Sequence, residues 1–180
     1  VLARLANGET LALVSDAGTP GVSDPGRLLT AAAAAAGFRV EPVAGPSAVA
    51  AILSVSGFPA IPFSFLGFPP SRHGERSRWY ARFAERDETR ILFESPFRVV
   101  ASLEEMARAS SDPQVCRGRE MTKLREEILR GPASAVAALL AKRPGIKGEI
   151  AVAAAPSTFQ ADAVAGPGTA GHGPGRVVVE

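Results

Sequence analysis

The sequence has 180 residues, of which 46% are hydrophobic, and a formal net charge of +2. This length and composition allow one domain or two small ones with a real core, and they exclude a largely disordered chain. The single cysteine, Cys116, excludes an internal disulfide and fits a reducing compartment. No stretch resembles a signal peptide or reaches the roughly 20 apolar residues of a membrane helix, so we expect a cytoplasmic protein without membrane contact. Two scattered histidines and one cysteine predict no metal site.

The first part of the chain predicts a helix, a strand and a second helix. Residues 1–8 are typical of the last turns of an amphipathic helix, so the start of the chain looks cut. The short apolar run 11–14 predicts a buried parallel strand, and a loop rich in glycine and proline follows it. Ser23 or Asp24 is expected to cap a helix over residues 27–36.

A second turn of the same kind follows a second predicted strand, residues 38–43. Gly45-Pro46-Ser47-Ala48 leaves that strand and leads into a helix over residues 49–55. In an open α/β sheet, ligands bind at the carboxyl ends of the strands, where such loops and Asp16 would lie. Two similar turns favour a ligand site, although a glycine- and proline-rich turn is often only a turn.

The remaining chain predicts a second α/β domain. Residues 59–62 are expected to link a first domain, 1–58, to a second domain, 63–155, with a disordered tail over 156–180. The second domain is predicted to contain strands over residues 63–66, 89–93, 114–119, 126–131 and 148–155, and helices over 75–86, 96–109 and 132–142.

Five motifs carry a resemblance to a known family. They are Ser15-Asp16-Ala17-Gly18-Thr19-Pro20 with Ser23-Asp24-Pro25-Gly26, Gly45-Pro46-Ser47-Ala48, Glu94-Ser95-Pro96-Phe97-Arg98, Arg119-Glu120-Met121-Thr122-Lys123 and Lys147-Gly148-Glu149-Ile150. Their order and spacing resemble the bacterial ribosomal RNA small subunit methyltransferase I family of the tetrapyrrole methylase superfamily. The resemblance implies a two-domain α/β fold with a mostly parallel sheet in the N-terminal domain and a mixed sheet in the C-terminal domain. The family's first strand and cofactor loop normally precede the position of Val1, so we expect a truncated first domain.

The resemblance also implies a function. Members of the family use S-adenosylmethionine to methylate the ribose 2′-hydroxyl of a cytidine in the decoding region of 16S rRNA within the 30S subunit, usually as homodimers. Carried over by position, the cofactor-binding residues would be Asp16, Ala17, Gly18, Thr19, Ser47, Ala48, Phe93, Gly118 and Ile150.

Charged residues at the predicted strand ends of the second domain are the catalytic candidates. Methyl transfer is an in-line displacement in which the protein aligns the nucleophile, and a ribose hydroxyl needs a carboxylate to take its proton or a cation to favour the alkoxide. The candidates are Glu94, Arg98, Arg119, Glu120 and Lys123. Structural roles are the alternative, with Glu94 capping a helix and Glu120 pairing with a neighbouring cation. Phe97 stands where the family usually has histidine, so no histidine at that position is essential in this protein.

RNA affinity is expected to come from basic side chains of the second domain. The candidates are Arg72, His73, Arg76 and Arg78, and a solvated helix face is the alternative for these residues. Trp79 and Tyr80 offer aromatic rings for base stacking, but their helical spacing favours packing inside the domain.

Two other functions stay open at this point. One is methylation of a tetrapyrrole or of a diphthine-type substrate within the same superfamily, whose members usually have Gly-Asp-Pro where this chain has Ser15-Asp16-Ala17. The other is a degenerate binding module without activity. Because the truncation would remove a central strand and a cofactor loop, we expect the 180-residue chain by itself to bind the cofactor poorly.

Overall fold

The computed structural model describes residues 1–160 except Ala17 and Arg86. It divides into two compact units, Val1–Ala48 and Val49–Glu180. The division precedes the expected linker at 59–62, because helix α3 (Ala48–Ser56) packs through Ile52 against the sheet of the second unit. Among the described residues, no helix is long and apolar enough to cross a membrane.

The first unit contains two helices, α1 (Leu2–Ala6) and α2 (Arg27–Ala35), which agree with the predicted helices. The strands predicted over 11–14 and 38–43 are wrong, since residues 1–16 and 18–48 form no strand. A strand needs hydrogen-bonded neighbours, and no other segment in the described part of this unit pairs with either stretch. The parallel sheet expected in the first domain is therefore not formed by these residues.

Helix α2 begins in a different way from the prediction. Its N-cap is Gly26, with φ of 134°, and neither Ser23 nor Asp24 caps it. A Cβ at Gly26 would lie 2.6 Å from the Cδ2 atom of Leu13. Glycine is therefore required here, because the chain turns with a positive φ directly under an apolar side chain.

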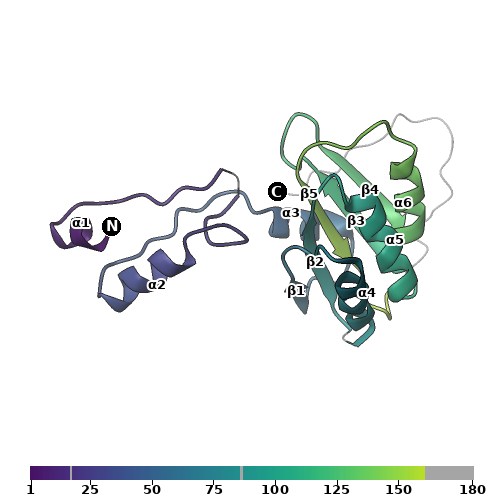
Figure 1. Cartoon of the computed structure of the whole chain (residues 1–180), viewed down its shortest axis with the longest axis horizontal. Helices are drawn as coiled ribbons and strands as arrows, with labels where there is room; N and C mark the ends of the chain where they lie inside the picture. Colours follow the sequence, from purple (N-terminus) through teal and green to yellow (C-terminus); the bar gives the residue numbers. More distant parts are fainter. Residues whose placement is uncertain (17, 86, 161–180) are drawn as a thin grey trace. The chain divides into compact units, whose positions relative to one another are not determined.

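The second unit is built on a five-stranded sheet with the order β1-β2-β5-β3-β4 (Figure 1). The strands are β1 (Phe63–Phe65), β2 (Thr89–Glu94), β3 (Gln114–Arg119), β4 (Glu127–Pro132) and β5 (Ile150–Ala154). Strand β1 is parallel to β2, whereas β5 is antiparallel to both β2 and β3, and β3 and β4 form a hairpin. The mixed sheet and all five predicted strands of this unit are confirmed.

Helices cover both faces of this sheet (Figure 1). One face carries α4 (His73–Ala81), α5 (Val99–Ala109) and α6 (Ala133–Ala141), and a short 3₁₀ turn, Arg82–Glu85, follows α4. The other face carries α3. Residues Val99, Leu103 and Met106 are fully or almost fully buried and share one side of α5, as the spacing of an amphipathic helix requires.

The chain beyond β5 remains packed for several residues. Pro156 is buried, and the hydroxyl of Thr158 donates to a carboxylate oxygen of Asp87 at 2.7 Å. The ring of Phe159 lies edge-on to Phe58, with 5.0 Å between centroids. The expectation of a disordered tail is therefore wrong for residues 156–160, and the rest of that tail, 161–180, lies outside the described residues.

Two adjacent leucines on α6 test the packing of this helix against the sheet. Leu140 is 1% exposed and Leu139 is 46% exposed. Replacing Leu140 with alanine leaves a cavity in the core, so Leu140→Ala should lower the free energy of unfolding by roughly 2–5 kcal/mol. Leu139→Ala is the matched control and should lower the free energy of unfolding by less than about 1 kcal/mol. Urea denaturation measures both, and equal losses would contradict the packing described.

Candidate functional site

The two glycine- and proline-rich turns of the first unit lie close together. The hydroxyl of Thr19 donates to the carbonyl oxygen of Pro46 at 3.5 Å, which links the first turn to the second. Asp16 is exposed, and Ser47 directly precedes the first residue of α3. The remaining candidates of these turns are Gly18, with φ of 71°, and Ala48, while Ala17 lies outside the described residues.

Three of the five motifs meet at one edge of the sheet in the second unit. Ile150 opposes Glu94 on one side and Arg119 on the other, so these residues form a row across β2, β5 and β3. The backbone N–H of Glu120 donates to the carbonyl oxygen of Glu149 at 2.9 Å. The catalytic candidates predicted from separate segments therefore come from one edge.

Glu94 is buried at this edge, and both of its carboxylate oxygens are occupied. Oε1 accepts from the Ser95 N–H at 2.7 Å and pairs with the Arg98 guanidinium at 2.8 Å, while Oε2 accepts from the Ser102 hydroxyl at 2.5 Å. The hydroxyl of Tyr80 lies 2.5 Å from Ser102 Oγ, and burial raises the pKa of Tyr80 above its ordinary value. Glu94 thus holds other side chains in place.

Glu120 sits in a tight turn against the start of β5. Its Oε1 accepts from the Glu149 N–H at 2.8 Å and from Lys123 Nζ at 3.4 Å. The backbone hydrogen bond from Glu149, and then the Lys123 ammonium, lower the pKa of Glu120. A Cβ at Gly148, where φ is 94°, would lie 2.6 Å from the Glu120 side chain, so glycine is needed here. Glu120 is therefore ionised at neutral pH.

Lys123 completes this turn. Its ammonium donates to Glu149 Oε2 at 3.0 Å, and this hydrogen bond raises the pKa of Lys123. The side chain of Lys123 is 45% exposed, and that of Arg119 is 23% exposed. Two partly exposed cations therefore stand beside the ionised carboxylate of Glu120.

The three cofactor candidates of the second unit do not share one face of the sheet. Phe93 packs on the α3 side, where its ring lies 4.8 Å from Phe65. Gly118 lies on the same side, and a Cβ there would collide with Met121. Ile150 instead belongs to the core on the opposite side. Ala151 is the residue of β5 that opposes both Phe93 and Gly118.

The four predicted RNA contacts differ in their surroundings. Arg72 and Arg78 are exposed, and the Arg72 side chain is 86% exposed. Arg76 is buried and is paired with the buried carboxylate of Glu105, so an RNA contact through Arg76 disagrees with the structure. The side chain of His73 is exposed, and its Nδ1 atom contacts the same carboxylate.

The buried polar residues of α5 were not predicted from the sequence. Ser102 and Glu105 are 2% exposed and lie among the apolar residues of the helix face that meets the sheet. Polar side chains within an apolar stripe of helical spacing indicate buried hydrogen bonds or ion pairs, because a buried charge must be paired. Ser102 donates a hydrogen bond to Glu94, and Glu105 pairs with Arg76.

A second buried ion pair was also missed. The side chain of Arg117 is fully buried in β3 and donates to Glu127 Oε2 at 2.7 Å, and Arg143 binds the same carboxylate at 2.7 Å. Burial lowers the pKa of Arg117. Burial by itself would raise the pKa of Glu127, but the hydrogen bonds from Arg117 and Arg143 lower it overall. Among the residues that the structure describes, no group of histidine, cysteine, aspartate or glutamate could hold a metal ion.

Comparisons with known proteins identify relatives. The sequence matches the tetrapyrrole (corrin/porphyrin) methylase family over residues 1–137. It is 46% identical over 132 residues to ribosomal RNA small subunit methyltransferase I of Xylella fastidiosa, covering 73% of this chain and 48% of that protein. It is 42% identical over 163 residues to the protein of the same name from Mesorhizobium japonicum, covering 90% of this chain and 55% of that protein. The chain thus spans about half the length of these curated relatives.

Solved structures share the fold. The methyltransferase CobJ matches with a TM-score of 0.64 and 18% identity, over 87% of this chain and 68% of that one. A uroporphyrin-III C-methyltransferase from Thermus thermophilus, complexed with S-adenyl homocysteine, matches with a TM-score of 0.53 and 19% identity, over 84% of this chain and 69% of that one. These similarities confirm the predicted α/β fold of the tetrapyrrole methylases.

The ion pair between Arg117 and Glu127 predicts a pH-dependent contribution to stability. Glu127→Gln leaves a buried guanidinium without its carboxylate, so it should lower the free energy of unfolding at pH 7 by roughly 1.5–3 kcal/mol. Because folding lowers the pKa of Glu127 from about 4.5, its contribution is present above pH 4.5 and is lost as the pH falls further. Denaturation from pH 7 to pH 3 should therefore show the wild type and the variant converging. Glu104→Gln, on the exposed side of α5, is the control, and a constant difference across this pH range would contradict the assignment.

Proposed function

The chain belongs to the tetrapyrrole methylase family, and from this premise we propose that the protein transfers a methyl group from S-adenosylmethionine to RNA. The acceptor is the ribose 2′-hydroxyl of a cytidine in the decoding region of 16S rRNA, position 1402 in the family's rRNA numbering. The observation that carries this proposal is the 42% identity over 90% of the chain to a relative named as an rRNA small subunit methyltransferase. We further propose that the protein acts in the cytoplasm on the 30S subunit, as a homodimer.

The residues present fit the chemistry of this cofactor. S-adenosylmethionine supplies a methyl group on a positively charged sulfur, which needs no covalent help from the protein. In the first unit, the exposed carboxylate of Asp16 and the hydroxyls of Thr19 and Ser47 suit the amine and hydroxyl groups of the cofactor. In the second unit, the ring of Phe93 suits its adenine ring, whereas the side chain of Met121 covers the strand position Gly118.

The chain's own residues at the sheet edge assist the acceptor hydroxyl. Both carboxylate oxygens of Glu94 are already occupied, so Glu94 does not accept the proton. Its role is to position Arg98. Glu120 is ionised and is the carboxylate we propose to accept the proton, but its lowered pKa makes it a weak base. The partly exposed cations of Arg119 and Lys123 share this work by favouring the alkoxide form. Exposed Arg72, Arg78 and His73 hold the RNA backbone.

Transfer of labelled methyl groups tests the proposal. The protein as its gene encodes it is incubated with tritiated S-adenosylmethionine and with 30S subunits that lack the modification. We expect label in 16S rRNA at a single cytidine, resistant to alkaline cleavage because its 2′-oxygen is methylated. The control is a decoding-region RNA with 2′-deoxycytidine at this position, which should receive no label. Transfer to a uroporphyrinogen or to a diphthine-type protein substrate instead, or cofactor binding without any transfer, would contradict the proposal.

Asp16 provides a separate test of cofactor binding. Removal of its carboxylate leaves polar groups of the cofactor without a partner, so Asp16→Ala should weaken S-adenosylmethionine binding by roughly 1–3 kcal/mol. The matched control is Glu41→Ala, which removes an exposed carboxylate that pairs only with Arg39 at 2.8 Å among the described residues. Calorimetric titration of the intact protein gives both dissociation constants. An unchanged constant for Asp16→Ala would remove Asp16 from the cofactor site.

A further inference from the structure

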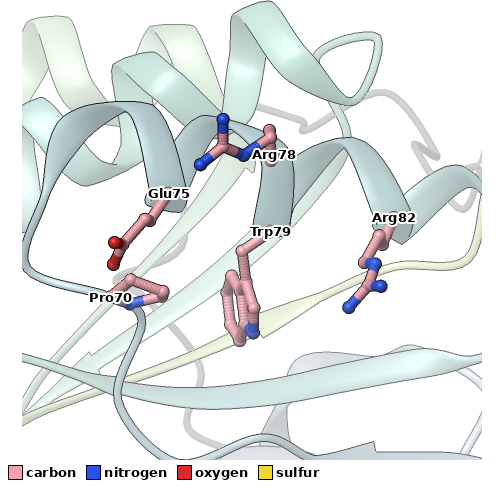
Figure 2. Close-up of a pocket in the computed structure, with 5 residues that line it drawn as sticks. All are labelled: Pro70, Glu75, Arg78, Trp79 and Arg82. Atoms are coloured by element: carbon pink, nitrogen blue, oxygen red, sulfur yellow. The ribbon is translucent and has the colours of Figure 1, made fainter.

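Helix α4 carries a hollow whose lining includes none of the catalytic candidates at the sheet edge described above. The hollow has a volume of about 340 Å³ and is lined by Pro70, Glu75, Arg78, Trp79 and Arg82. Figure 2 shows the Trp79 indole between Pro70 and Arg82, with Glu75 and Arg78 above it. Positions 75, 78, 79 and 82 recur at helical spacing, which places these side chains on one side of the helix and the turn that follows it.

The indole of Trp79 is held rigidly but is not enclosed. Its ring lies 5.1 Å from the Tyr80 ring and 5.1 Å from the Phe83 ring, and both of those residues are buried. Trp79 itself is half-buried and lines the hollow. Packing therefore fixes one side of the indole and leaves part of its apolar surface open to a ligand.

Two cations without an ion-pair partner among the described residues stand beside this ring. Arg78 and Arg82 are exposed, and neither guanidinium forms a salt bridge with any residue in the described part of the chain. Of the neighbouring cations, Arg76 is bound to buried Glu105, whereas Arg72 lies 3.6 Å from Glu75 and keeps 86% of its side chain exposed. The charge that remains available in the hollow is therefore positive, except for the half-exposed carboxylate of Glu75.

A rigid aromatic ring next to free guanidiniums is the chemistry that binds an unpaired nucleotide. A base stacks on the ring, and the phosphate is bound by arginine, whose fork of donors matches its oxygens. A carboxylate such as that of Glu75 accepts a hydrogen bond from an exocyclic amino group. The volume lies at the lower end of the range for small-ligand sites, which is room for one base.

We propose that this hollow binds one unpaired nucleotide of the RNA substrate, with its base on Trp79 and its phosphate between Arg78 and Arg82. The inference rests on the proposed function and adds a subsite to it. It assigns base stacking to Trp79 and a phosphate contact to Arg82. Tyr80 is completely buried and takes no part.

Fluorescence of Trp79 reports binding directly. The sequence contains one tryptophan. In the intact protein, the fluorescence of Trp79 is the difference between the emission of the wild type and that of Trp79→Phe. Titration with a short, unpaired, cytidine-containing oligoribonucleotide should quench this signal in a saturable way, and the same length of duplex RNA should not. Poly-glutamate is the probe for an acidic peptide partner, and quenching by it as strong as that by RNA would overturn the proposal.

Substitutions separate stacking from charge. Trp79→Leu keeps apolar volume but removes the ring, so it should weaken RNA binding roughly 5- to 100-fold, the range expected for loss of one stacked base. Trp79→Phe keeps an aromatic face and should restore most of the affinity. The double variant Arg78→Gln/Arg82→Gln should make the slope of log affinity against log salt shallower by about 1–2, whereas Arg108→Gln, on the exposed side of α5, should leave it unchanged.

The two proposals fail in different ways. If Trp79→Leu methylates 30S subunits with the same KM as the wild type, the proposed subsite is overturned and the proposed function is left intact. Absence of methyl transfer by the wild type would overturn the proposed function, whatever the fluorescence shows. A folded Trp79→Leu protein, judged by circular dichroism and its unfolding midpoint, with unchanged RNA affinity would also overturn the subsite.

Discussion

The pairing of β5 between β2 and β3 is the constraint on which the second unit depends. All five residues of β5 are buried, and three of them are alanines, whose small side chains let helices pack closely on the sheet. Since β5 runs antiparallel to both neighbours, its first residue, Ile150, meets the last residues of β2 and β3. Chain segments that are far apart in the sequence thereby deliver Glu94, Arg119 and Glu120 to one edge.

Charged side chains in this unit fall into two groups. Buried carboxylates bind cations inside the fold, as Glu105 does with Arg76, and the partly buried Glu127 does so with Arg117. These pairs hold helices and strands in position, because leaving either partner alone in the core is costly. The exposed cations of α4 have weak partners or none in the described part of the chain, so they remain available to an anionic substrate. Burial, rather than residue type, thus separates structural arginines from candidate RNA contacts.

Sequence patterns predicted the second unit well because its signals are local. The apolar spacing of α5 is visible in a short window, and the two strands of the β3–β4 hairpin lie close together in the sequence. The same reasoning was wrong for 11–14 and 38–43, since an apolar run predicts a strand only if another strand pairs with it. It also placed Arg76 among the surface cations, although Arg76 is buried, because composition does not show which side of a helix a neighbouring element covers.

Hydrogen–deuterium exchange of the intact protein, with and without S-adenosyl homocysteine, is the most direct test of the proposed cofactor-binding residues. We expect slower exchange on binding in peptides covering residues 15–19 and 45–48 of the first unit, and 91–95 and 117–121 of the second. Peptides covering α6, on the opposite face of the sheet from α3, should be unaffected. Protection confined to other segments, or no protection at saturating ligand, would contradict the assignment of these residues to a cofactor site.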